Sequence, residues 1–78
     1  MGRLPRKVKY KDGTFAKVGD TVCNPTIPSV RYTVTEVLDV YLDAYGYAHP
    51  NVLKLRMHGM VESVEQHHFA NYFMLVHS

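Results

Sequence analysis

The sequence predicts an all-β fold, a small and strongly bent β-barrel, on two observations. First, residues 17–22 read Lys-Val-Gly-Asp-Thr-Val, a tight turn that leads into a strand. Second, residues 30–42 alternate between apolar and polar side chains with a period of two, which is typical of a long half-buried strand. A helix over 34–43 is the competing interpretation. The many Val and Thr residues and the poor 3.6-residue spacing disfavour it.

The elements before the long strand are indicated by turn-forming residues. Asp12-Gly13 is the strongest short turn signal in the chain, and it predicts a small hairpin between Lys7–Lys11 and Thr14–Lys17. Pro25 and Pro28 bracket a predicted loop, because neither residue can donate a hydrogen bond to a neighbouring strand.

The long strand has one fault in its alternation, at Glu36-Val37, where the two faces exchange polarity. We expect a β-bulge or a sharp bend there, since a small barrel needs one to turn a corner. Residues 43–51 follow as a loop that contains Gly46 and Pro50.

The last third of the chain predicts two more strands and a short turn. Val52–Met57 alternates again, and His58-Gly59 is a candidate two-residue hairpin connection. That connection pairs Met57 with Met60, Leu55 with Glu62 and Leu53 with Val64. Glu62 is a misfit in this register, so a loop that is one residue longer is the alternative. Gln66–Tyr72 has room for one 3₁₀ turn, and Phe73–Val76 forms a final short strand. The predicted core contains Val18, Val22, Tyr32, Val34, Leu38, Leu53, Leu55, Val64, Phe73 and Leu75.

Length and composition limit the class of protein. Seventy-eight residues, 46% hydrophobic and 21% charged, make one globular domain with a thin core. The single Cys23 excludes an internal disulfide, which suits a reducing compartment. No apolar run approaches the roughly 20 residues that cross a bilayer, and the basic N-terminus is not followed by the hydrophobic segment of a signal peptide. We therefore expect a soluble, cytoplasmic protein.

Charge is distributed unevenly along the chain. Residues 1–17 carry six Lys or Arg residues against one Asp, whereas the remainder carries three basic against six acidic residues. Gly2 and Pro5 break regular structure in the basic segment, and its positive charges repel one another. These features divide the chain into a basic, partly flexible N-terminal arm at 1–11 and a barrel domain at 12–78.

Four segments carry a resemblance to a known family: Lys-Val-Gly-Asp-Thr-Val (17–22), Tyr-Thr-Val-Thr-Glu-Val (32–37), Val-Leu-Lys-Leu-Arg (52–56) and Phe-Met-Leu-Val (73–76). Together they resemble the SH3-like barrels, and the opening is closest to the KOW-type barrels of ribosomal proteins and transcription elongation factors. The resemblance implies a five-stranded SH3-like barrel with a binding role. It implies no ligand, because Asn24–Ser29 stands where the KOW pattern has the glycines of its contact turn. The short chain with its basic arm also resembles bacteriophage accessory proteins.

The spacing of reactive residues does not indicate catalysis or a metal site. The five histidines are His49, His58, His67, His68 and His77. They lack the paired spacings of zinc ligands, and adjacent residues in a strand point to opposite faces. No nucleophile, base and orienting group are spaced so that they are expected to meet. We therefore expect a protein that is not an enzyme and that uses no metal and no cofactor.

Two binding functions and one structural role remain open. A regulatory module that docks onto a larger partner protein is indicated by the tyrosines around the 43–51 loop, since tyrosine is enriched at interface hot spots. Its predicted site residues are Tyr41, Tyr45, Tyr47 and His49. The alternative is direct binding of nucleic acid, with phosphates held by the basic arm and bases stacked on tyrosines. Its predicted site residues are Arg3, Arg6, Lys7, Lys9, Lys11 and Lys17. The third possibility is oligomerisation through an exposed barrel edge.

Overall fold

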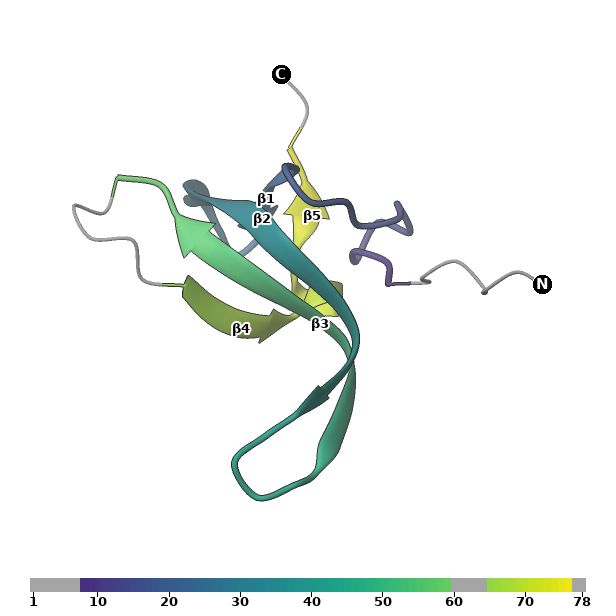
Figure 1. Ribbon diagram of the computed structural model, residues 1–78. Helices are drawn as coiled ribbons and strands as arrows, with labels where there is room; N and C mark the ends of the chain where they lie inside the picture. The colour runs from purple at the N-terminus through teal and green to yellow at the C-terminus, as the bar shows by residue number, and fades with distance from the viewer. Residues whose placement is uncertain (1–7, 60–64, 77–78) are drawn as a thin grey trace.

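A computed structural model describes residues 8–59 and 65–76, and these residues form one five-stranded antiparallel sheet (Figure 1). The elements are β1 (Thr21–Asn24), β2 (Ile27–Leu42), β3 (Ala48–Met57), β4 (Glu65–Phe69), the 3₁₀ helix η1 (Ala70–Tyr72) and β5 (Met74–Leu75). Their order in the sheet is β4-β3-β2-β1-β5, which confirms the all-β prediction. Within the described residues the edge strands β4 and β5 do not pair with each other, so the sheet is open.

The long strand β2 bends at a β-bulge, close to where the sequence predicts one. Val34 pairs with Leu55 and Glu36 with Lys54, so Thr35 is the extra residue. The Thr35 hydroxyl donates to the Lys54 carbonyl oxygen at 3.1 Å. The bulge lies one or two residues before the predicted fault at Glu36-Val37. The extra residue shifts the alternation only for the residues after it, so the polarity pattern shows the change after the bulge itself.

The hairpin formed by the end of β2 and the start of β3 projects beyond the rest of the sheet (Figure 1). It is longer than predicted, since β3 begins at Ala48 and only residues 43–47 form the connecting turn. Pro50 pairs with Val40 before β4 joins β3, so its missing N–H faces no neighbouring strand. Asn51 has a φ of 58°, a left-handed conformation inside a strand, and it marks the bend at the base of the hairpin. At the other end of β2, the predicted Pro25–Pro28 loop is reduced to a tight turn at 25–26.

The predicted pairing of β3 with the following strand is wrong by four residues. Leu55 pairs with Gln66 and Leu53 with His68, instead of Glu62 and Val64. A two-residue connection is too short, because β4 begins only at Glu65. In the observed register Glu65 lies opposite Arg56, where it accepts a hydrogen bond from that guanidinium. Met60 and Val64 lie outside the described residues.

The core lies on one face of the bent sheet. Its buried residues are Val8, Tyr10, Val22, Val34, Leu53, Leu55, Ala70 and Phe73. The prediction is confirmed for Val22, Val34, Leu53, Leu55 and Phe73, and Tyr32 and Leu75 pack against this cluster. Leu38 is half-buried. Val18 was expected in the core and is exposed, because it lies in the turn that the Asp20 N–H closes onto the Lys17 carbonyl.

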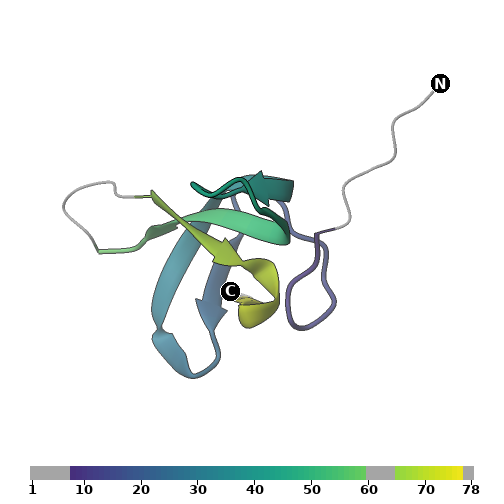
Figure 2. The same cartoon turned by 90° about the horizontal axis from the view of Figure 1, so that it is seen from below.

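The N-terminal hairpin predicted around Asp12-Gly13 is present in the described residues (Figure 2). Lys9 bridges to Phe15, and the Tyr10 N–H donates to the Thr14 carbonyl at 2.9 Å. Val8 and Tyr10 are buried, so residues 8–11 pack with the domain, although the sequence places them in the arm. Two bonds fix this packing: the Tyr10 hydroxyl donates to Asp20 Oδ2 at 2.7 Å, and the Lys11 N–H donates to the Phe73 carbonyl at 2.8 Å.

Among the described residues, no helix has the length and apolar character that crossing a membrane requires.

Candidate functional site

The tip of the β2–β3 hairpin presents two tyrosines to solvent. Tyr45 is 86% exposed and Tyr47 is 69% exposed. Asp43 holds the turn that carries them: its Oδ1 accepts the N–H groups of Tyr45 at 2.8 Å and Tyr47 at 3.0 Å. The turn is closed further by the N–H of Gly46, which donates to the Asp43 carbonyl and has a φ of 85° that favours glycine. The aromatic side chains therefore project from a fixed backbone.

Asp43 also joins the two strands of the hairpin. Its Oδ2 lies 2.8 Å from Nε2 of His49, which pairs with Tyr41 in the register of the hairpin. The hydrogen bond from His49, followed by the two backbone N–H groups, holds the pKa of Asp43 below its ordinary value, although partial desolvation opposes this. The carboxylate is consequently ionised at neutral pH.

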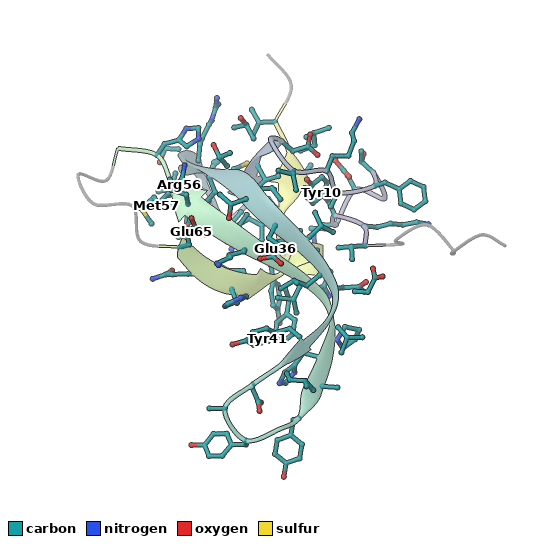
Figure 3. The ribbon with its side chains drawn as sticks, viewed as in Figure 1. Tyr10, Glu36, Tyr41, Arg56, Met57 and Glu65 are labelled. Carbon is teal, nitrogen blue, oxygen red and sulfur yellow. The ribbon has the colours of Figure 1, made fainter. Side chains whose placement is uncertain are left out.

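A groove of about 330 Å³ lies between the base of the hairpin and the β4–η1 segment. Its lining consists mainly of rings, contributed by Tyr41, His49, His67, His68, Phe69 and Tyr72, together with Asp43 and Val52. Tyr41 of β2 stacks on His67 of β4, with ring centroids 4.1 Å apart and an interplanar angle of 26°. Since β2 and β4 are not neighbours in the sheet, this contact exists only because the hairpin bends toward β4. Figure 3 shows Tyr41 where the hairpin leaves the sheet, below β4.

The far wall of the groove is formed by two aromatic residues that the sequence did not assign to a site. Phe69 and Tyr72 meet edge to face with centroids 6.0 Å apart, and Phe69 also contacts the ring of His49 at 5.7 Å. They are 40% and 58% exposed. Tyr72 also lines three neighbouring surface pockets, so four pockets, the groove included, share this residue.

The four predicted protein-binding residues are thus divided between two adjoining surfaces. Tyr45 and Tyr47 form the hairpin tip, and Tyr41 and His49 line the groove. Phe69 and Tyr72 could not be assigned from the sequence, because the register of β4 decides which way they point. The one available signal was their spacing of three residues across a predicted 3₁₀ turn, which places both on one side.

The predicted nucleic-acid-binding residues lie in a different part of the molecule. Lys9, Lys11 and Lys17 are exposed, and Lys9 stands 5.0 Å above the ring of Phe15. Arg3, Arg6 and Lys7 lie outside the described residues. Lys11 shares a hollow with Tyr72, which places one cation beside one exposed aromatic ring.

The cations of β3, Lys54 and Arg56, are already paired with acids. Figure 3 labels Arg56 and Glu65, which lie close together on β3 and β4. Glu65 Oε2 lies 3.2 Å from the Arg56 guanidinium, and its Oε1 lies 3.5 Å from Lys54 Nζ. The hydrogen bond from Arg56 is the main reason that the pKa of Glu65 is lowered. These charges are largely neutralised within the sheet and offer little to a phosphate backbone.

In the described parts of the chain, no three His, Cys, Asp or Glu side chains come together as metal ligands. Cys23 lies half-buried in β1, with Arg31 and Met74 beside it in the register. His49 and Asp43 make a close pair, but the carboxylate organises a turn and neither residue faces a nucleophile in any contact described above.

His68 makes the stability of the fold depend on pH. It lies half-buried against the rings of Tyr32 and Phe73, and burial lowers its pKa, as does the neighbouring His67. An unfolded chain therefore takes up a proton at position 68 more readily than the folded chain once the pH falls below about 6.5. We expect stability to be present above that pH and to be lost on acidification.

The measurement is the urea midpoint of unfolding at pH 7.5 and pH 5.5, for the native sequence and for His68→Gln. The midpoint of the native sequence should fall at the lower pH, and the fall should be smaller in the variant, which cannot titrate at this position. An equal fall in both proteins would assign the effect to other groups.

Comparison with protein families, curated proteins and solved structures identified no relative of this chain. No family model matches the chain, and no curated protein and no solved structure matches it. What the protein does must therefore be argued from the surfaces described above.

Proposed function

We propose that this chain is a non-catalytic, regulatory binding module that docks onto a larger partner protein in the cytoplasm. The hairpin tip and the adjoining groove form the docking surface. The observation that carries the proposal is the exposure of Tyr45 and Tyr47 on a turn whose backbone is held by Asp43.

Two large rings held in solvent gain nothing for the isolated fold, since burial of aromatic surface is what stabilises a domain. They suit binding, because a tyrosine brings a large contact area with few rotatable bonds and a fixed turn lowers the entropy lost on association. Val40 and Leu42 of the same hairpin are also exposed. They alternate with Tyr41 along β2, so they give the hairpin a second apolar surface on the face opposite the groove.

We also propose that the sheet is the framework of an SH3-like barrel. The support is the strand order β4-β3-β2-β1-β5, with a long bulged β2 that pairs with both β1 and β3. A strand that bends in this way is the device by which small barrels pass from one half to the other. In such a framework a projecting hairpin is a natural place for a binding surface, because loops and tips vary while the sheet positions them.

The test is a double substitution at the tip, Tyr45→Ala with Tyr47→Ala. We expect at least 100-fold weaker binding of a partner captured from lysate with the native protein, since each hot-spot tyrosine contributes about 2 kcal/mol or more. Binding is measured by calorimetry with the purified partner, and urea unfolding checks that the variant is folded.

Phe15→Ala is the matched control, because Phe15 is an exposed aromatic outside the hairpin and the groove. It should leave partner binding unchanged. If the Tyr45→Ala, Tyr47→Ala variant still binds the partner and Phe15→Ala does not, the docking surface lies on the N-terminal hairpin instead.

Direct binding of nucleic acid is the second candidate function, supported by Lys11 beside the exposed ring of Tyr72. Fewer observations favour it, because Lys54 and Arg56 are paired with acids and Asp43 lies in the groove. Its signature is binding of single-stranded DNA or RNA with a steep dependence on salt, measured by fluorescence anisotropy at about 50 and 200 mM salt.

A further inference from the structure

We propose that the groove beside the hairpin binds a positively charged side chain of the partner protein, and that an arginine guanidinium is the group it fits best. This inference rests on the docking function and names what the partner inserts.

The tyrosine and phenylalanine rings that line the groove come from three elements. Tyr41 belongs to β2, Phe69 to β4 and Tyr72 to η1. One face of Tyr41 is covered by His67, and Phe69 and Tyr72 meet edge to face while staying substantially exposed. The faces of aromatic rings carry partial negative charge, so a cation that lies against them is attracted.

The groove carries negative charge, as do the faces of its aromatic rings. Among the residues that the structure describes, Asp43 is the single acidic residue in the lining, and neither Lys nor Arg contributes to it. The pKa of Asp43 is lowered, so it is ionised at neutral pH, and the lowered pKa of His68 keeps that imidazole uncharged there. A cationic group therefore meets complementary charge, whereas a phosphate meets a carboxylate.

Guanidinium fits this lining better than ammonium. The Asp43 carboxylate already accepts three hydrogen bonds, from His49, Tyr45 and Tyr47. It therefore has little acceptor capacity left for a bidentate hydrogen bond to a ligand, and it contributes mainly through its negative charge. Binding must then come mainly from stacking, and the flat guanidinium stacks on aromatic rings while a strongly hydrated ammonium does so less well. A volume of about 330 Å³ is ample for one arginine side chain and small for a larger ligand.

The test is an NMR titration of the ¹⁵N-labelled full chain with N-acetyl-arginine methylamide at pH 7.5. The matched probe is N-acetyl-citrulline methylamide, which has nearly the same shape and no charge. We expect saturable shifts at the amides of Tyr41, Phe69 and Tyr72 with the arginine probe, and at least tenfold weaker binding of the citrulline probe. Equal binding of both probes, or no shift at these amides, overturns the proposal.

Two variants connect the shifts to the groove. Tyr72→Leu keeps an apolar side chain but removes the ring, and we expect it to weaken arginine binding at least fivefold. Phe15→Ala, outside the groove, should bind the probe as the native protein does. Unchanged binding in Tyr72→Leu overturns the proposal, as does a nucleoside monophosphate that shifts the groove amides more strongly than arginine.

The outcomes also separate this inference from the docking function. Partner binding that is lost with the two tip substitutions and unaffected by Tyr72→Leu would keep the docking function and reject the arginine site. The opposite outcome is that arginine binds in the groove while the tip variant still binds the partner as the native protein does. That outcome would reject the docking function as proposed and leave a cation site without its assigned partner.

Discussion

We expect removal of residues 1–11 to unfold the domain at 25 °C and removal of residues 1–7 to leave it folded. The longer deletion takes Val8 and Tyr10 out of the core and removes the Lys11 N–H bond to Phe73. Loss of a buried aromatic side chain alone costs about 3–5 kcal/mol. A chain of 78 residues has a free energy of unfolding of about 4–12 kcal/mol, so the combined loss is comparable to the whole. The shorter deletion removes none of the contacts described here.

Circular dichroism with urea unfolding measures the effect on both truncated proteins. Tyr10→Phe is the graded control: it keeps the ring and loses the hydrogen bond to Asp20, which we expect to lower the free energy of unfolding by about 1.5 kcal/mol. Burial and the bond to Asp20 also raise the pKa of Tyr10, so the folded state disfavours the tyrosinate. A 1–11 deletion that melts within a few degrees of the native protein would show that the hairpin only lies against the core.

The same result decides how the role of the basic arm is tested. An assay that removes residues 1–11 and finds no binding of nucleic acid would report unfolding as well as lost charge. Removal of residues 1–7 takes away Arg3, Arg6 and Lys7 and keeps the core, so it isolates the electrostatic contribution.

The N-terminal hairpin shows which signals the sequence contained and how one was missed. Asp12-Gly13 correctly predicted the turn, because a local dipeptide determines it. The lysines at 7, 9 and 11 suggested a solvated arm, but the residues between them, Val8 and Tyr10, alternate with them in the period of a half-buried strand. The apolar residues decided the packing, since the lysine side chains can point away from it.

The groove shows where sequence reasoning ends. The hairpin residues Tyr41 and His49 were found because tyrosines cluster in a recognisable segment. Phe69 and Tyr72 were not, because their positions depend on the pairing of β3 with β4. That register depends on the length of the connecting segment and on the packing of His68 against the core, which are long-range properties without a local pattern. The Thr35 bulge and the left-handed Asn51 then determine the bend that brings Tyr41 to His67.

Phe73→Ala should lower the free energy of unfolding by about 3–5 kcal/mol, the second large effect that the structure predicts. Phe73 is buried, and its ring contacts Tyr32 at 5.4 Å with an interplanar angle of 88° and His68 at 5.5 Å. Phe73→Leu fills much of the same space and should cost less than about 1.5 kcal/mol. Urea unfolding at pH 7.5 compares the two variants. Equal losses in both would indicate that the ring contacts, and not the cavity, account for the effect.

The Phe73→Leu variant also tests whether the core fixes the groove, because His68 lines the groove and its ring contacts the core residue Phe73. The pKa of His68 is lowered mainly by burial, and a smaller, more mobile neighbour lets water approach the imidazole. We expect the pKa of His68, followed by NMR, to rise toward its ordinary value in this variant, and the loss of stability at acid pH to shrink with it. An unchanged pKa would mean that β4 alone sets the environment of His68. The groove wall would then be independent of the core ring, and Phe73 would act on stability without acting on the proposed arginine site.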